Sequence, residues 1–326
     1  MNPEPVQSTL PVGTASISTF PQTFESVCSS IERVVRGKRP VIQLAVVCLF
    51  AGGHLLVEDV PGVGKTVLSK ALARSTGGRF SRVQFTPDLL PSDVIGTSVW
   101  NQSSGEFVFH RGPIFSNVLL ADEINRASPK TQSALLEAMA ENQVTVDGAT
   151  IGLEHPFMVI ATQNPLEHQG TYPLPESQLD RFMMKLSMGY PGHDDELGLL
   201  LNTKIEDQTS KLSPVIATGS IPEITAALEG VHVADSVAKY LLAIARESRS
   251  SDRFILGISP RALIGWLRAS KVLAAAQGRA FVSPDDAKSL AVHVLAHRVI
   301  PAGARYGPAD ASAAIRELLD STPVPT

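Results

Sequence analysis

The sequence predicts an α/β fold in which a parallel sheet is flanked by helices, followed by a smaller all-helical domain. Between residues 24 and 191, short apolar segments typical of strands alternate with segments of helical periodicity. From residue 192 onward only helical patterns remain. We therefore expect an α/β core at residues 23–191 and a helical domain at 192–326, after a disordered tail at 1–22 that is rich in Pro, Ser and Thr.

The composition excludes several classes of protein. With 44% hydrophobic residues among 326, the chain can bury a core in each domain. A net charge of −4 and the absence of a long basic run argue against nucleic-acid binding. The opening residues lack a secretory signal, and the most apolar run, 41–57, is interrupted by polar residues and glycines, so no membrane span is expected. Cys28 and Cys48 suggest neither a disulfide framework nor a zinc site, and a cytoplasmic location fits best.

The elements follow from local patterns, in chain order. Helices are expected at 24–36, ended by Gly37, and at 41–50, and strands at 55–57, 80–85, 118–121 and 157–161. Hairpins are expected at 100–111 and 143–153, with a helix between them that starts at the Ser128 cap and runs to about 142. In the second domain, helices are expected at 196–201, 221–228, 234–246, 260–276 and 284–299, the last two with Ser-Pro caps at Ser259 and Ser283.

The most informative stretch is residues 57–66, VEDVPGVGKT, which lies between an expected strand and an expected helix. A polyphosphate must be met by many backbone N–H groups, and Gly62 and Gly64 leave room for that approach. Lys65 stands at a helix N-terminus, which favours anions, and Thr66 offers a hydroxyl to Mg²⁺. A chance turn does not require GKT between strand and helix, so we interpret this stretch as a phosphate-binding loop.

The loop departs from the general G-x-x-x-x-G-K-[ST] pattern at its first position, where the chain has Asp59. Aspartate tolerates the left-handed backbone conformation better than most residues. We therefore expect the loop to form in spite of this change.

A second set of polar residues follows later strands. Asp122 and Glu123 end the apolar strand 118–121, where one could hold Mg²⁺ and the other could polarise water. On its own such a pair is more often a solvated strand end, but after a phosphate loop it becomes specific. Asn164 could bind the same water or act only as a turn residue before proline, and Arg181 and Arg261 are by themselves ordinary surface residues.

The order of these motifs resembles that of AAA+ ATPases, and the residues within them are similar to those of the MoxR family. The residues that carry the resemblance are DVPGVGKT at 59–66, GPIFSNVLLADEINRASPKTQSALLEAMAE at 112–141, ATQNP at 161–165, GTYPLPESQLDRF at 170–182 and SPR at 259–261. The likeness extends from about residue 24 to beyond 281 and implies a P-loop AAA+ core with a helical lid. It implies that the chain hydrolyses ATP with Mg²⁺.

The resemblance also assigns roles to residues. It implies a nucleotide-binding loop that includes Pro61, Gly62, Val63, Gly64, Lys65, Thr66 and Val67, with Val35 and Gly37 beside adenine. It implies Mg²⁺ coordination by Thr66 and Asp122, catalysis by Glu123, and a sensor role for Asn164. Arg181 would act on a neighbouring subunit's nucleotide, and Arg261 would report the γ-phosphate to the lid.

The implied partners are other copies of the chain, arranged in a hexameric ring, and a client with a von Willebrand factor A domain. The implied activity is chaperone-like remodelling or maturation of that client. Two alternatives remain open: a nucleotide-gated binding module with little turnover, and a magnesium-chelatase-like ATPase subunit. A DNA-translocating motor is disfavoured by the acidic balance and by hairpins with few cations.

Overall fold

The core is built on a five-stranded sheet in which every neighbouring pair of strands is parallel. The computed structural model describes residues 17–165, 170–201, 208–303 and 308–324. The sheet has the order β2-β5-β8-β1-β9. Its strands are β1 (Leu55–Glu58), β2 (Phe80–Gln84), β5 (Val118–Asp122), β8 (Met158–Gln163) and β9 (Met184–Leu186). The predicted α/β class is confirmed.

Helices cover both faces of the sheet because successive side chains of a strand point to opposite faces. Leu55 and Val57 belong to one hydrophobic cluster, and Leu56 between them belongs to the other. The helices of the core are α1 (Phe20–Glu32), α2 (Arg39–Phe50), α3 (Lys65–Ser75), α4 (Pro91–Ile95), α5 (Pro129–Glu141) and α6 (Glu176–Leu179). The first three share the cluster of Leu55, and α4 and α5 share that of Leu56. With both faces covered, the edge where the strands end remains for a ligand.

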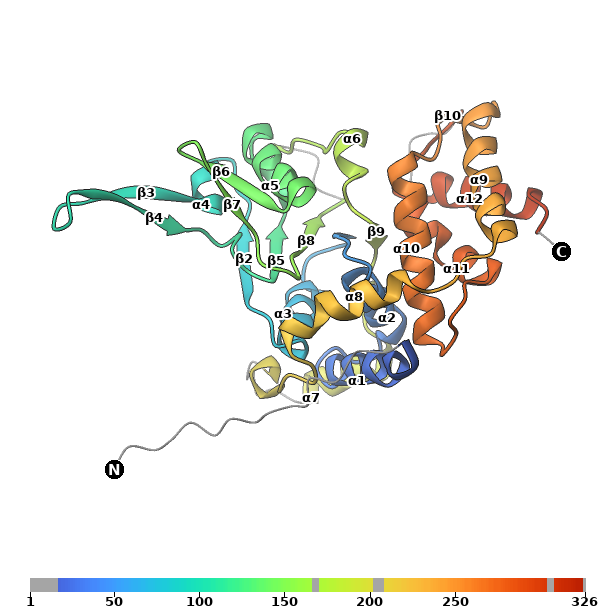
Figure 1. The fold of residues 1–326 in the computed structure, drawn as a ribbon, viewed down its shortest axis with the longest axis horizontal. Helices are drawn as coiled ribbons and strands as arrows, with labels where there is room; N and C mark the ends of the chain where they lie inside the picture. The colour runs from blue at the N-terminus through green and yellow to red at the C-terminus, as the bar shows by residue number, and fades with distance from the viewer. Residues whose placement is uncertain (1–16, 166–169, 202–207, 304–307, 325–326) are drawn as a thin grey trace.

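Both predicted hairpins are present outside the main sheet. One is β3 (Gly96–Asn101) with β4 (Glu106–Arg111), and the other is β6 (Gln143–Val146) with β7 (Ala149–Gly152). The first begins four residues before the predicted position and projects far from the core (Figure 1).

The C-terminal part is helical, as predicted. Its helices are α7 (His193–Leu201), α8 (Ile221–Glu229), α9 (Asp235–Ser250), α10 (Pro260–Ala276), α11 (Pro284–Leu295) and α12 (Pro308–Ser321). Ser259 and Ser283 cap α10 and α11, accepting hydrogen bonds from the N–H groups of Ala262 and Asp286. No helix in the described ranges is both long and apolar enough to cross a lipid bilayer.

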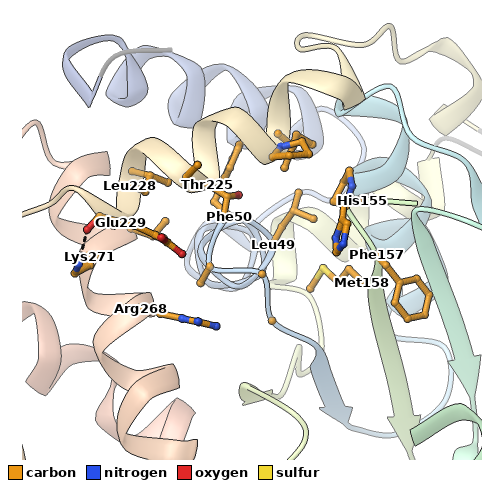
Figure 2. Close-up of a pocket in the computed structure, with 18 of the residues that line it drawn as sticks. Leu49, Phe50, His155, Phe157, Met158, Thr225, Leu228, Glu229, Arg268 and Lys271 are labelled. Atoms are coloured by element: carbon orange, nitrogen blue, oxygen red, sulfur yellow. Dashed lines mark hydrogen bonds between the residues drawn. The ribbon is translucent and has the colours of Figure 1, made fainter. Parts of the chain in front are cut away.

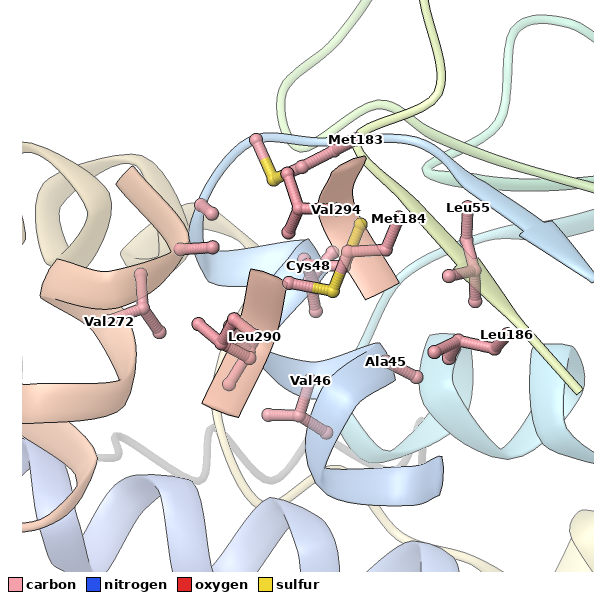
Figure 3. Packing of buried hydrophobic residues seen from close by; sticks show 14 of the residues in the cluster. Ala45, Val46, Cys48, Leu55, Met183, Met184, Leu186, Val272, Leu290 and Val294 are labelled. Atoms are coloured by element: carbon pink, nitrogen blue, oxygen red, sulfur yellow. The ribbon is translucent and has the colours of Figure 1, made fainter. Parts of the chain in front are cut away.

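The helical part and the core share one hydrophobic interior. Figure 3 shows Cys48 of α2 and Met184 of β9 beside Val272 of α10 and Leu290 of α11. Trp266 of α10 is fully buried, and its indole N–H donates to the Ala287 carbonyl at 2.7 Å. The lid is therefore anchored against α2 and the edge strand β9.

Several predicted boundaries were wrong. The helix predicted to end at Gly37 ends at Glu32, and residues 33–38 form a loop in which Gly37 has a φ of +67°. The helix predicted for 284–299 ends at Leu295 and continues as the 3-10 turn η5 (Ala296–Arg298). The predicted tail extended to residue 22, but η1 (Ile17–Thr19) is helical and Phe20 is buried against Phe50. The rest of that tail, residues 1–16, lies outside the described residues.

The prediction that strands stop after residue 192 was also wrong. A short antiparallel pair joins β10 (Phe254–Leu256) to β11 (Ile300–Pro301). Strands of two or three residues cannot display an alternating pattern, so they leave no signal in the sequence. For the same reason β9, which has three residues, was not predicted. The helix α12 was also missed, although its length does not explain that.

Candidate nucleotide-binding site

The loop between β1 and α3 has the backbone that its glycines suggest. Gly62 and Gly64 have φ values of +86° and +95°, a region that other residues rarely enter. Gly64 caps the N-terminus of α3, so the free N–H groups of the first turn face the loop. Lys65 begins the helix, and its ammonium donates to the Asp59 carbonyl at 2.8 Å. An anion in this loop would meet backbone N–H groups and a lysine ammonium.

Asp59 does not fill the role expected of it. Left-handed φ values among the described non-glycine residues occur at Glu123, Asn142 and Asp147, but not at Asp59. The aspartate is accepted here because its carboxylate accepts hydrogen bonds from residues 187–189, not because it tolerates a left-handed backbone.

The acidic strand end lies on the same edge of the sheet as the loop. Asp122 is the last residue of β5, and β5 is separated from β1 by β8 alone. Its Oδ1 accepts a hydrogen bond from the Thr162 hydroxyl at 2.6 Å, and its Oδ2 forms an ion pair with Arg82 at 2.7 Å. The neighbouring strands β8 and β2 therefore fix the orientation of this carboxylate.

Glu123 is held in a left-handed conformation with φ 57° and ψ 50°. Its Oε2 accepts hydrogen bonds from the Gln84 amide at 2.7 Å and from Arg126 at 2.9 Å. Its backbone N–H donates to the Thr162 hydroxyl at 2.8 Å. One threonine on β8 thus orients both acidic residues.

The donor set fits Mg²⁺. No group of three or more His, Cys, Asp or Glu side chains in the described part of the chain could hold a metal by itself. Magnesium in nucleotide sites uses one or two protein ligands together with phosphate oxygens and water. The Thr66 hydroxyl at the start of α3 and the Asp122 carboxylate are the protein donors that could hold it.

Three further predicted residues lie at this end of the site. Asn164 follows β8, whose last residue pairs with the last residue of β1, and it is 8% exposed. Val35 is buried and Gly37 is exposed in the loop between α1 and α2. The loop at 33–38 borders the site through two neighbouring residues. Lys38 at its end donates to the carbonyl of Tyr190, and the preceding residue, Gly189, donates its N–H to Asp59 of the phosphate loop.

Arg181 lies at the end of the sheet where the strands begin, opposite the end that bears the phosphate loop. The chain passes from Arg181 into β9, and the N–H of Met183 donates to the carbonyl of His54, the residue before β1. The phosphate loop follows the other end of β1. The length of that strand, about 10 Å, therefore separates the phosphate loop from the segment of Arg181. The Arg181 guanidinium donates to the Leu136 carbonyl of α5 at 2.6 Å.

The segment that contains Arg261 lies at that same end of the sheet, where the strands begin. Ser259, two residues earlier, donates its hydroxyl to the Asp180 carboxylate at 2.8 Å. The segment of Arg181, predicted to act on a neighbour's nucleotide, and that of Arg261, predicted to report the γ-phosphate to the lid, therefore lie near each other and away from the loop of their own chain.

Comparisons with known proteins agree with this geometry. Residues 54–184 match the ATPase family associated with various cellular activities (AAA), and residues 246–318 match the AAA lid domain. The chain is 37% identical over 305 residues to Chaperone MoxR1 of Mycobacterium tuberculosis, covering 91% of this chain and 80% of that protein. This chain belongs to the MoxR family of AAA+ ATPases.

Two other comparisons cover nearly the whole of this MoxR-family chain. It is 48% identical over 296 residues to the uncharacterized protein YeaC of Bacillus subtilis, covering 90% of this chain and 92% of that one. The crystal structure of a protein described as a candidate ATPase from Cytophaga hutchinsonii matches with a TM-score of 0.85 at 36% identity, covering 95% and 97% of the two chains. The predicted P-loop AAA+ fold with a lid is confirmed.

Sequence reasoning missed four residues that orient the acidic pair of this MoxR-family site. They are Arg82, Gln84, Arg126 and Thr162. Arg82 and Gln84 are two apart at the end of β2, so they share a face of the strand. The alternate polar positions of Arg82 and Gln84 at a strand end were the signal in the sequence that could have indicated their contact with the acidic pair.

A cavity of about 350 Å³ lies elsewhere in this MoxR-family chain, between the end of α2, α8 and α10 (Figure 2). Leu49 and Phe50 line it from α2, and Arg268 and Lys271 line it from α10. None of the predicted nucleotide-binding residues contributes to its wall. The cavity is therefore distinct from the candidate nucleotide site.

Proposed function

We propose that this chain hydrolyses ATP and uses the energy to remodel or mature another protein. The observation that carries the proposal is the meeting of two motifs at one edge of the sheet: the lysine-bearing loop after β1 and the acidic pair after β5. Parallel strands deliver their following residues to the same edge, where ligands of such sheets bind.

Each residue has a chemical task in this proposal. The loop N–H groups and Lys65 bind the phosphates, and Thr66 with Asp122 holds Mg²⁺. Magnesium, when bound, neutralises charge on the phosphate oxygens. Glu123 orients and polarises the attacking water, and Asn164 lies where it can bind that water or the terminal phosphate.

A second copy of the chain completes the site in this proposal. Arg181 lies at the end of the sheet opposite to the loop, so it can act on the nucleotide of a neighbour. Arg261, whose segment contacts Asp180, would report the γ-phosphate to the lid. A surface that meets a different surface on the next copy produces a ring when the rotation closes. We propose a homo-oligomeric ring, hexameric as the family resemblance implies.

The client in this proposal is another protein on which the ring acts. A relative at 37% identity is named a chaperone, which supports a chaperone-like role. The family resemblance further suggests a partner with a von Willebrand factor A domain. We also propose a cytoplasmic location, which the sequence signals favour.

A nucleotide-gated binding module is the competing function, and one observation favours it. Gln84 and Arg126 both donate hydrogen bonds to the Glu123 carboxylate, and these bonds compete with a water molecule for the same oxygen. Steady-state phosphate release distinguishes the two functions, because an ATPase releases phosphate continuously as it turns over and a binding module releases almost none.

Two substitutions test the proposed hydrolysis. Lys65→Ala should abolish nucleotide binding because it removes the ammonium that meets the phosphates. Glu123→Gln should bind ATP with nearly unchanged affinity and lower turnover by about a hundredfold or more, the usual contribution of a positioned general base. The measurements are binding of a fluorescent ATP analogue and phosphate release. Wild-type turnover in both variants would refute the site.

A pull-down with the Glu123→Gln variant held in ATP extends this test to the client. A ring stalled before hydrolysis should retain its client, whereas the Lys65→Ala variant should not.

A further inference from the structure

Asp59 carries a carboxylate that is buried, fully hydrogen-bonded and unused by the proposed chemistry. The residue is 7% exposed. Its Oδ1 accepts the N–H of Val60 at 2.9 Å. Its Oδ2 accepts the Ser187 hydroxyl at 2.9 Å and the N–H groups of Met188 and Gly189 at 2.6 and 2.7 Å. Burial opposes ionisation, yet these hydrogen bonds outweigh it and lower the pKa of the Asp59 carboxyl below its usual range.

The three donors at 187–189 belong to the segment that connects the sheet to the helical part. They follow β9 directly and precede α7. Met188 is 4% exposed, and its methyl group would lie 3.6 Å from a Cβ built on Gly64 of the phosphate loop. The connecting segment therefore packs against the loop as well as bonding to it.

The same segment continues along the site toward the loop at 33–38. Lys38 donates to the Tyr190 carbonyl at 2.6 Å. The Asp195 carboxylate occupies the space that a Cβ at Gly37 would need. Residues 187–195 thus border the candidate site from the phosphate loop to Gly37, the residue expected near adenine.

Asp59 contacts the loop lysine through a different group. Its backbone carbonyl accepts the hydrogen bond of the Lys65 ammonium at 2.8 Å. A polyphosphate in the loop would compete for that ammonium, since a charge-assisted bond to phosphate is stronger than one to a neutral carbonyl. Asp59 therefore bonds to the Lys65 ammonium through its backbone carbonyl and to residues 187–189, which lead to α7, through its side chain.

We propose that Asp59 is a positioning residue that couples occupation of the phosphate loop to the segment 187–189, and through it to α7. The proposal rests on the proposed function, because it requires the loop to bind a nucleotide. A glycine at this position would provide no such connection. The coupling is thus a property of the aspartate that departs from the general loop pattern.

The experiment compares full-length wild type with Asp59→Asn, Asp59→Gly and Ser187→Ala. Asparagine turns an amide toward N–H donors, glycine removes the side chain, and Ser187→Ala removes one of the four donors. Asp194→Asn is the matched control because that carboxylate is fully exposed. Amide hydrogen exchange over residues 186–196 is measured with and without MgADP, beside nucleotide affinity, kcat and KM.

In wild type we expect nucleotide to change the exchange of Met188 and Gly189, whose N–H groups bond to Asp59. In Asp59→Asn and Asp59→Gly these amides should exchange at least about tenfold faster without nucleotide, because charge-assisted bonds are lost. Their response to nucleotide should disappear, and kcat should fall while KM changes little. Ser187→Ala should keep a reduced response, and Asp194→Asn a full one.

Each other result overturns the proposal in a distinguishable way. An undiminished exchange response in both Asp59 variants, with nucleotide bound, refutes the coupling alone and leaves the proposed function intact. A wild-type protein that binds no nucleotide refutes both. Should the Asp59 variants fail to fold, an undiminished response in Ser187→Ala refutes the coupling.

Discussion

At the scale of single residues, the environment of Glu123 sets how readily it can act on water. Its Oε2 accepts hydrogen bonds from Gln84 and Arg126, so a water molecule that donates to this oxygen must compete with both. Gln84 lies opposite Asp122 in the β2–β5 register, so its amide reaches the strand end from the neighbouring strand. One of the two hydrogen bonds that hold the Glu123 carboxylate therefore comes from β2.

Gln84→Ala should raise the basal rate of ATP hydrolysis. It removes one hydrogen bond of about 1 kcal/mol from the carboxylate, which corresponds to roughly a fivefold rate increase. Phosphate release without a client measures the change. Gln43→Ala, at an exposed position of α2, is a control away from the acidic pair. A rate for Gln84→Ala at or below wild type would contradict the restraint.

His54 is a second residue whose surroundings determine its chemistry. Its Nδ1 accepts the N–H of Val159 at 3.1 Å, and its Nε2 lies 3.1 Å from the Met139 carbonyl. Burial lowers the pKa of His54 to about 4, although the bond to Met139 opposes the shift. The imidazole is therefore neutral in the folded protein at pH values where an unfolded chain takes up a proton.

Acid should consequently destabilise the folded protein through His54. The contribution is fully present above the unfolded pKa of about 6.5 and is lost as the pH falls toward 4, because only the unfolded state binds the proton. Between about pH 7.5 and about pH 5 the loss is about 2 kcal/mol. Urea unfolding at both pH values should show this loss reduced in His54→Asn. It should remain in His193→Ala, whose ring is 90% exposed, and an equal loss in all three proteins would contradict the assignment.

At the scale of elements, the N-terminus of α10 links the lid to the segment of Arg181. The Ser259 hydroxyl accepts the N–H of Ala262 as a cap and donates to Asp180. Ser283 caps α11 in the same way but bonds to Asp286 of its own helix. The two serines share a capping role and differ in their contact with the core.

This pair permits a matched test. Ser259→Ala and Ser283→Ala should each lower the free energy of unfolding by about 1 kcal/mol, the usual value of a cap. Only Ser259→Ala should also lower ATP turnover, because it frees the segment that bears Arg181. Thermal unfolding and phosphate release measure the two effects, and equal turnover in both variants would separate the lid from Arg181.

At the scale of the whole molecule, the lid contacts the residues on both sides of Arg181. Arg298 and His297 of η5 both contact the Phe182 carbonyl, and Arg298 also forms an ion pair with Asp180 at 3.6 Å. Both η5 residues are buried, and their contacts reach Asp180 and Phe182, on either side of Arg181. A movement of the lid should therefore move Arg181 relative to a neighbouring copy.

Mixing inactive variants tests whether sites form between copies. Lys65→Ala lacks the ammonium proposed to bind the phosphates, and Arg181→Ala lacks the guanidinium proposed to act on the neighbour's nucleotide. Mixed rings should recover part of the wild-type ATP turnover, because some interfaces combine an intact loop with an intact arginine. Phosphate release at several ratios measures the recovery. The absence of recovery at every ratio, in rings shown to exchange subunits, would contradict action between copies.

Much of the site could be predicted because its motifs are local. Gly62, Gly64 and Lys65 act through a loop whose backbone depends on residues near in sequence, and Asp122 and Glu123 follow directly from the end of their strand. The bonds of Arg82, Gln84 and Thr162 to that acidic pair could not be predicted. They join residues 39 or 40 positions apart in the chain through the pairing of strands.

The fold class, the glycine loop and the acidic strand end could be predicted from the order of residues, because apolar periodicity and glycine positions express local preferences of the backbone. By contrast, the folded chain was needed to see that Asp59 bonds to residues 187–189 and that Arg181 and the start of α10 lie at the end of the sheet opposite the loop. These placements depend on the order of strands in the sheet and on where the lid packs. Both are set by burial of side chains that are far apart in the chain.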